Sequence, residues 1–438
     1  MKLVNLLFIL LILNFLSECN DESKPTTNIS KAKTEVATES TRPNIIYILA
    51  DDHAEKAISA YDKTLINTPN LDRIAKEGML FRNSFVTNSI CAPARATILT
   101  GLYSHLNGKR DNEDIFDGSQ PTCIKALQEN GYHTSVIGKW HLQSEPQGFD
   151  YWQTLIGQGD YYNPTFITNG DTAQAIGYTS TIITDQALAQ LEERTQSDQP
   201  FCMLYWHKAP HRNWMADLQD LPGLLEKRYP EPPTLRDDYK GRPAAEEADM
   251  RIAHMYTSKD LKVSPDVDPV DSNTGGHPTH DPMQSFKHTI VNLTPEQRAE
   301  WDPFMREVGE QWLKVKGTDE ELAWRYQRYM QDYLASIVSV DRNVGRVLDF
   351  LDENDLAENT IVIYSSDQGF YLGEHGWYDK RFMYEESMRT PLMIRYPKMV
   401  KASSENTNLV QNLDMAPTLL DLAGIDVPER MQGNSLKP

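Results

Sequence analysis

Positive charge and cysteine are both scarce in this sequence. Lys and Arg number 43 against 63 Asp and Glu, which gives the 438 residues a formal net charge of −20 at pH 7. A chain of this sign repels an anionic polymer at long range, which argues against a nucleic-acid partner. An anionic substrate would therefore need a local cationic pocket. The composition, with 39% hydrophobic and 24% charged residues, is otherwise that of a globular protein with a sizeable core.

Only four cysteines are present, at positions 19, 91, 123 and 202. Cys123 and Cys202 could pair in an oxidising compartment. Both lie in segments of apolar pattern, however, and this favours buried free thiols. Internal repeats are also absent from the sequence.

No apolar run is long enough to span a bilayer comfortably. The longest run, residues 3–16, follows Lys2 and is typical of an export signal over residues 1–18. Leu16-Ser17-Glu18-Cys19 resembles a bacterial lipoprotein cleavage box, which favours lipidation of Cys19 over simple secretion. Residues 19–42 then form a polar, flexible tether. We expect an exported protein, either a lipoprotein of the outer membrane or a periplasmic protein, with a lipid anchor as its only membrane contact.

Apolar runs alternate with amphipathic segments along most of the chain. Strands are expected at 44–50, 79–86, 133–140, 201–206, 360–365 and 391–396, and helices at 68–78, 93–101, 122–130, 184–195, 294–308, 321–353 and 415–423. This alternation predicts an α/β fold with a doubly wound, mainly parallel sheet, whose ligands bind beyond the carboxyl ends of the strands. We interpret residues 43–438 as one catalytic domain. Residues 215–320, rich in proline and charge, are interpreted as an insertion that shapes the substrate cleft.

One short segment carries the most specific chemical signal. Cys91-Ala92-Pro93-Ala94-Arg95 continues to Leu99-Thr100-Gly101, and Pro93 favours a helix that ends at Gly101. Cys91 would lie at the mouth of that helix, where free N–H groups and the helix dipole favour an anion such as sulfate. The segment resembles the maturation signature of the type I sulfatases, and the resemblance extends from about residue 43 to residue 436.

The resemblance implies that Cys91 is the precursor of another group. In type I sulfatases a maturase oxidises this cysteine to formylglycine, and one hydroxyl of the hydrated aldehyde attacks sulfur while the other expels the sulfate. A thiolate would perform only the first half of this reaction. The resemblance also implies the alkaline-phosphatase-like α/β fold. Members of the family usually end in a smaller C-terminal sheet, which this chain would largely lack.

Polar residues follow two of the expected strands and indicate a metal site. Asp51-Asp52 comes after one strand and Asp367-Gln368 after another, so four oxygen donors would meet in one crevice. Such donors suit a hard cation such as calcium. Their order relative to Cys91 is similar to the sulfatase metal site. The resemblance implies one Ca²⁺ bound by these four residues and by the group made from Cys91.

Three carboxylates against one dication leave a net charge of −1, and a sulfate ester would add another negative charge. Cations must therefore compensate. The positions that match sulfatase cations and proton donors are Arg95, Lys139, His141, His211 and Lys380.

The resemblance assigns these five residues their roles. Arg95 would hold the formylglycine, and Lys139 and Lys380 would bind sulfate oxygens. His141 would act on the hydrate to release sulfate, and His211 would protonate the departing sugar oxygen. Arg212 and His375 are further candidates, which could reach sugar hydroxyls of the substrate.

The sequence thus predicts a sulfuric ester hydrolase that acts on a sulfated oligo- or polysaccharide and resembles glucosamine-6-sulfatases and ulvan-active sulfatases. Its other expected partner is the formylglycine-generating maturase. One alternative is a phosphoesterase of the same superfamily, which would normally use serine or threonine and two zinc ions bound by several histidines. Cys91 and the lack of a histidine cluster argue against it. The other alternative is a surface lipoprotein that captures glycans without turnover, if Cys91 is never matured.

Overall fold

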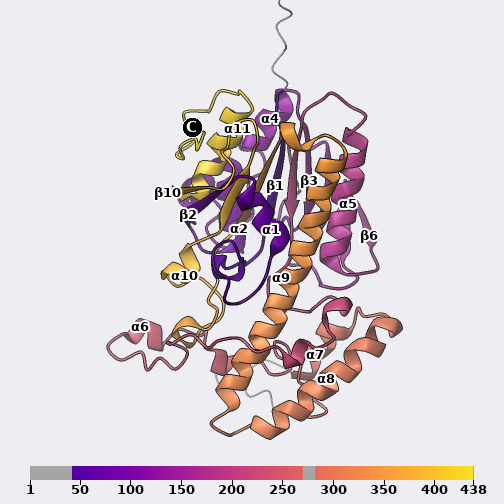
Figure 1. Cartoon of the computed structure of the whole chain (residues 1–438), viewed down its shortest axis with the longest axis vertical. Helices are drawn as coiled ribbons and strands as arrows, with labels where there is room; N and C mark the ends of the chain where they lie inside the picture. Colours follow the sequence, from indigo (N-terminus) through magenta and orange to yellow (C-terminus); the bar gives the residue numbers. More distant parts are fainter. Residues whose placement is uncertain (1–41, 270–281, 438) are drawn as a thin grey trace, which may run out of the picture. The chain divides into compact units, whose positions relative to one another are not determined.

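The structure is a computed structural model that describes residues 42–269 and 282–437. The predicted export signal (1–18), the lipidation of Cys19 and the tether up to residue 41 lie outside these residues. A ten-stranded sheet forms the centre of the described chain, with helices on both of its faces (Figure 1). Its strands are β1 (Asn44–Ala50), β2 (Met79–Phe85), β3 (His133–Gly138), β4 (Tyr151–Leu155), β5 (Thr165–Thr168), β6 (Asp171–Gln174), β7 (Phe201–Trp206), β8 (Thr360–Ser366), β9 (Leu392–Arg395) and β10 (Ser404–Gln411).

Eleven helices are found in the described residues. They are α1 (Pro69–Lys76), α2 (Cys91–Thr100), α3 (Ser104–Asn107), α4 (Cys123–Glu129), α5 (Thr179–Arg194), α6 (Pro243–Glu246), α7 (Pro282–Ile290), α8 (Pro295–Val315), α9 (Glu321–Glu353), α10 (Glu385–Met388) and α11 (Met415–Leu422). Single 3₁₀ turns cover Glu55–Ala57, Leu218–Asp220, Leu224–Glu226, Ile252–His254, Ala357–Asn359, Glu374–Gly376 and Asn412–Asp414.

The strand order is β10-β2-β9-β8-β1-β7-β3-β4-β5-β6. The pairs β8·β1, β1·β7, β7·β3 and β3·β4 are all parallel. Antiparallel pairing is confined to β9, which lies between β2 and β8, and to β5, which lies between β4 and β6. The α/β fold with a mainly parallel sheet is confirmed.

The two faces of the sheet bury separate apolar cores. Ile46 and Ile48 of β1 point to one face, where they pack with α1, α5 and α9. Ile45 and Tyr47 point to the other face, where they pack with α2, α4 and α11. Successive side chains of a strand alternate between faces, so a strand buried on both faces reads as a continuous apolar run. This explains why the core strands could be predicted from the sequence.

Several predicted boundaries differ from the observed ones. Helix α2 starts at Cys91 and not at Pro93, because proline fits the first turn of a helix, where no intrahelical N–H bond is lost. Helix α5 begins at Thr179, five residues before the expected start. The helix expected at 294–308 extends to Val315, and Thr294 is its N-cap in a reciprocal capping box with Gln297. Strands β4, β5, β6 and β10 were not predicted.

Residues 215–320 hold short helices and turns up to residue 269, and then α7 and α8 from residue 282 onward. Val308 and Trp312 of α8 bury their side chains against Leu225 and Val263 of the same region. Figure 1 shows the long helix α9 extending from the sheet to α8. In the described part of the chain, no helix combines the length and apolarity needed to cross a bilayer.

Candidate active site

The predicted carboxylates meet at the carboxyl ends of two neighbouring strands. Strand β1 ends at Ala50, which is paired with Ser366 of β8, so the residues that follow both strands lie side by side. The Asp52 N–H donates a 3.1 Å hydrogen bond to Oδ1 of Asp367. Asp51, Asp52 and Asp367 are completely buried, and one carboxylate oxygen of each lies within 4.8 Å of the others.

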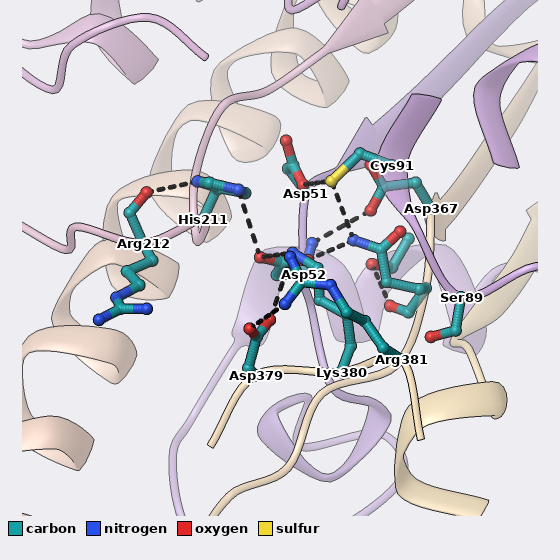
Figure 2. A network of polar contacts seen from close by, with 12 residues as sticks. Asp51, Asp52, Ser89, Cys91, His211, Arg212, Asp367, Asp379, Lys380 and Arg381 are labelled. Carbon is teal, nitrogen blue, oxygen red and sulfur yellow. Dashed lines mark hydrogen bonds and ion pairs between the residues drawn. The ribbon is translucent and has the colours of Figure 1, made fainter. Parts of the chain in front are cut away.

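Cys91 is the first residue of α2, and its thiol faces this carboxylate group. Its Sγ donates to Oδ1 of Asp51 at 3.2 Å and accepts from Nε2 of Gln368 at 3.4 Å (Figure 2). Burial raises the pKa of the thiol to about 12, so Cys91 itself is neutral at pH 7. Cys123 and Cys202 are buried free thiols, as predicted.

Three buried cations balance the three carboxylates. Arg95 donates to Oδ2 of Asp367 from Nε at 3.0 Å and from Nη2 at 2.9 Å. Burial lowers the pKa of Lys139 well below its usual value, but its Nζ contacts the Asp51 carboxylate, which favours the charged form. The ammonium of Lys380 contacts both oxygens of Asp52 at 2.6 and 2.7 Å. The attraction within each pair offsets part of the cost of desolvating the two charges. Arg95 thus binds Asp367, and its expected contact with the group made from Cys91 remains a prediction.

Burial and ion pairing have opposite effects on the pKa values of Asp52 and Lys380. Burial, opposed by the Lys380 ammonium and reinforced by Asp367, raises the pKa of Asp52 to about 6. For Lys380, burial lowers the pKa, but the Asp52 carboxylate outweighs this effect and the net shift is upward. The pair is therefore ionised at neutral pH.

His211 follows β7 and lies at the edge of the same group. Its Nδ1 donates to the Arg212 carbonyl, which leaves Nε2 3.8 Å from Oδ2 of Asp52 (Figure 2). Burial and the cations Lys139 and Lys380 lower the pKa of His211 well below its usual value. The imidazole is therefore neutral at pH 7.

His141 is held in place by Gln158. The Gln158 side chain accepts from Lys139 through Oε1 and contacts Nε2 of His141 at 3.1 Å through its amide nitrogen. Burial and nearby Lys139 lower the pKa of His141. The side-chain amide of Gln158 therefore bridges Lys139 and His141.

Arg212 and His375 lie outside the carboxylate group. The Arg212 guanidinium forms a bidentate ion pair with Asp260, at 2.7 and 2.6 Å. His375 lies 3.6 Å from carboxylate oxygens of Asp237 and of Glu386, and its ring packs 4.8 Å from that of Tyr384. Their expected contacts with sugar hydroxyls remain a prediction.

The donors present fit a hard divalent cation. Three carboxylates converge, and the side-chain oxygen Oε1 of Gln368 is buried with no hydrogen-bond partner among the described residues. An orphaned buried oxygen beside converging carboxylates suits oxygen coordination. The neighbouring residue His53 is not counted among these donors, because its imidazole forms hydrogen bonds with the Tyr364 hydroxyl and the Ala57 carbonyl.

Three residues near the site were not predicted from the sequence. Gln158 and Asp260 lie in irregular segments with no motif that could have marked them. Lys208 belongs to the segment His207-Lys208-Ala209-Pro210-His211 after β7, so its position at a strand end was the available signal.

Comparisons with known proteins give several matches over most of the chain. A protein-family model described as Sulfatase matches residues 43–425. The chain is 47% identical over 407 residues to N-acetylglucosamine-6-O-sulfatase of Bacteroides thetaiotaomicron, covering 91% of this chain and 71% of that protein. It is 26% identical over 454 residues to the ulvan-active sulfatase of Formosa agariphila, covering 100% and 71%. The solved structure of BT4656 with its substrate D-glucosamine-2-N,6-O-disulfate matches with a TM-score of 0.84 and 47% identity, covering 91% and 80%.

Proposed function

Because this chain belongs to the sulfatase family and is therefore a sulfuric ester hydrolase, we propose that its substrate is a glucosamine-type saccharide that carries a 6-O-sulfate. The family and the enzyme class predicted from the sequence are confirmed. The 47% identity to an N-acetylglucosamine-6-O-sulfatase supports the choice of substrate class over ulvan, to whose sulfatase the identity is 26%.

One observation carries the mechanism: a buried thiol begins a helix and contacts Asp51 and Gln368 within a group of three carboxylates. We propose that a maturase converts Cys91 to formylglycine, so that Sγ marks the place of a reactive oxygen. Asp51 then accepts a hydrogen bond from that oxygen and increases its nucleophilicity. The N-terminal dipole of α2 favours the anion that binds beside it.

We propose calcium as the metal, bound by Asp51, Asp52, Asp367 and Gln368 through oxygen atoms, with the group made from Cys91 as a further ligand. The chemistry that such a cation supplies when bound is the stabilisation of negative charge on the nucleophile and on the sulfate. The two hydrogen bonds that Arg95 donates to Oδ2 hold the Asp367 carboxylate in position.

The remaining side chains have separate roles in this proposal. Lys139 and Lys380 bind sulfate oxygens and stabilise the charge that develops on them. A bound sulfate ester favours the protonated form of His211, whose Nε2 then donates a proton to the departing sugar oxygen. His141 exchanges the hydrogen bond that its Nε2 accepts from Gln158 for one from the hydrate, and takes a proton at Nε2 as sulfate is released.

We also propose that the protein is exported, and that Cys19 carries a lipid that anchors it at the outer membrane. The apolar segment after Lys2 and the cleavage box before Cys19 support this proposal. Globomycin, which blocks lipoprotein processing, should then cause an unprocessed precursor to accumulate, and Cys19→Ala should release the protein from membranes. Unchanged processing and membrane association would contradict the anchor.

The mechanism can be tested by mass spectrometry of the peptide that spans residue 91, after expression with and without a maturase. We expect the aldehyde only with the maturase, and sulfate release from N-acetylglucosamine-6-sulfate in proportion to the aldehyde content. Cys91→Ala is the matched control and should release no sulfate. Activity in a preparation whose Cys91 is entirely unmodified would refute the mechanism. A fully converted enzyme that releases sulfate from other saccharides only would refute the substrate class.

A further inference from the structure

A cavity of about 310 Å³ lies against His211 and outside the carboxylate group. It is lined by Gln158 and His211, which also belong to the active site, so the two regions are continuous. Three cations line it as well, namely Lys208, Arg212 and Lys259. These cations lie beside apolar side chains such as Tyr161 and Met215, so the cavity suits a ligand with an anionic group.

Lys208 is the more buried of the two lysines in this cavity. Lys208 is 3% exposed, and its Nζ lies 4.8 Å from the centroid of the Tyr161 ring. Over residues 42–269 and 282–437, the structure gives this Nζ neither a hydrogen bond nor an ion pair. A buried ammonium without an acceptor is unfavourable, and an anion in the cavity would supply the missing acceptor.

The charge state of Lys208 is compatible with this role. Burial lowers its pKa to about 8, and the carboxylates of Asp160 and Asp52 oppose the shift. Most of the ammonium therefore stays protonated at pH 7. Asp160 also lines the cavity, but one of its oxygens is occupied by Asn292 at 2.8 Å.

Arg212 is fixed on the opposite side of His211 from Cys91 (Figure 2). Its ion pair with completely buried Asp260 uses Nε and Nη2, and the rings of Tyr378 and Tyr256 lie 4.9 and 5.7 Å from the guanidinium carbon. The other Nη group makes no hydrogen bond to any described residue, so it is available to a ligand. Asp260 is thus a positioning residue for Arg212.

We propose that this cavity is a subsite for a second anionic substituent of the saccharide, bound by Lys208 with Arg212 and Lys259 while the scissile sulfate occupies the carboxylate site. This inference rests on the proposed function. The cavity begins at His211, which would protonate the scissile oxygen, so the second anion belongs to the same sugar or to its neighbour. An N-sulfate on the same ring and a uronate carboxylate on the next one share the required chemistry.

The test is isothermal titration calorimetry with calcium-loaded full-length protein produced without a maturase, which binds substrate but does not turn it over. The probes are N-acetylglucosamine-6-sulfate, D-glucosamine-2-N,6-O-disulfate, and a disaccharide of a uronate linked to N-acetylglucosamine-6-sulfate. We expect at least one probe with the second anion to bind ten-fold or more tightly than the first probe. The probe that gains identifies whether the anion is on the same or the neighbouring sugar.

Lys208→Met should reduce this ratio to below about three-fold, whereas Lys227→Met, which removes an exposed lysine, should preserve it. The same ratio in wild-type and Lys208→Met protein would overturn the subsite, as would a wild type with no preference for either doubly anionic probe. A parallel turnover assay with matured enzyme separates the two proposals. If no glucosamine sulfate is hydrolysed, the proposed function fails, while the calorimetric ratio still decides the subsite.

Discussion

Lys139→Met removes one buried charge while nearly preserving the length of the side chain. Burial lowers the pKa of Lys139 well below its usual value, but its Nζ contacts Asp51 and Gln158. The Asp51 carboxylate and a bound sulfate both favour the charged form of Lys139. In a site of effective dielectric constant about 20, a unit charge about 4 Å from the sulfate is worth about 4 kcal/mol. If that interaction is realised in the transition state, its loss corresponds to a decrease of about 10³-fold in kcat/KM.

The assay is sulfate release from N-acetylglucosamine-6-sulfate, normalised to the formylglycine content of each preparation. The affinity for calcium is a second quantity to measure, and it should not fall when kcat/KM falls. Without Lys139 the Asp51 carboxylate is less neutralised, so calcium should bind as tightly as in the wild type or more tightly. The control is Lys227→Met, which removes an exposed lysine and should change neither quantity.

The reasoning would be refuted by a folded and fully matured Lys139→Met enzyme whose kcat/KM stays within ten-fold of wild type. A large loss of calcium affinity would also contradict it, because Lys139 would then support the metal site and not the sulfate.

Chelation of calcium should abolish sulfate release reversibly while the protein stays folded, because three buried cations already balance the carboxylates; activity that persists in metal-free protein would contradict this. His207→Leu tests a buried imidazole, since burial lowers the pKa of His207 to about 3 and the unfolded chain takes up this proton below pH 6.5. The wild type should therefore lose about 2 kcal/mol of unfolding free energy relative to the variant between pH 7 and pH 5, as measured by urea denaturation. Asp341→Ala should lower the unfolding free energy by about 3 kcal/mol, because the Asp341 carboxylate accepts from the first N–H groups of α1, those of Asn70 and Leu71, at 3.0 and 2.8 Å. An unfolding midpoint equal to that of wild type would show that water replaces this cap.

Burial on both faces explains which parts of the fold could be predicted from the sequence. Strands β1, β7 and β8 have continuous apolar runs, and α9 matches its predicted bounds because its buried residues recur at helical spacing. All four residues of strand β6 are exposed, and β10 buries only one of its eight residues, so neither has a hydrophobic pattern. Their pairing with β5 and β2 depends on tertiary contacts that no local signal encodes.

The sequence likewise predicted part of the site, namely its carboxylates, but not the contacts between its side chains. Strand ends identified Asp51, Asp52 and Asp367, because a parallel sheet brings its carboxyl ends to one edge. The pairing of cations with carboxylates could not be predicted, since it depends on side-chain directions. The same holds for Gln158 and Asp260, which reach the site from irregular segments.

Complete burial of Cys91 bears on when a modifying enzyme could reach it. All ten residues of α2 are buried, and the thiol has no exposed surface in the folded chain. The thiol contacts Asp51 and Gln368, which follow strands β1 and β8. These two strands are separated by more than 300 residues of sequence. Oxidation by a maturase would therefore have to occur while the polypeptide is still nascent or unfolded, and the yield of active enzyme would depend on a kinetic competition between modification and folding.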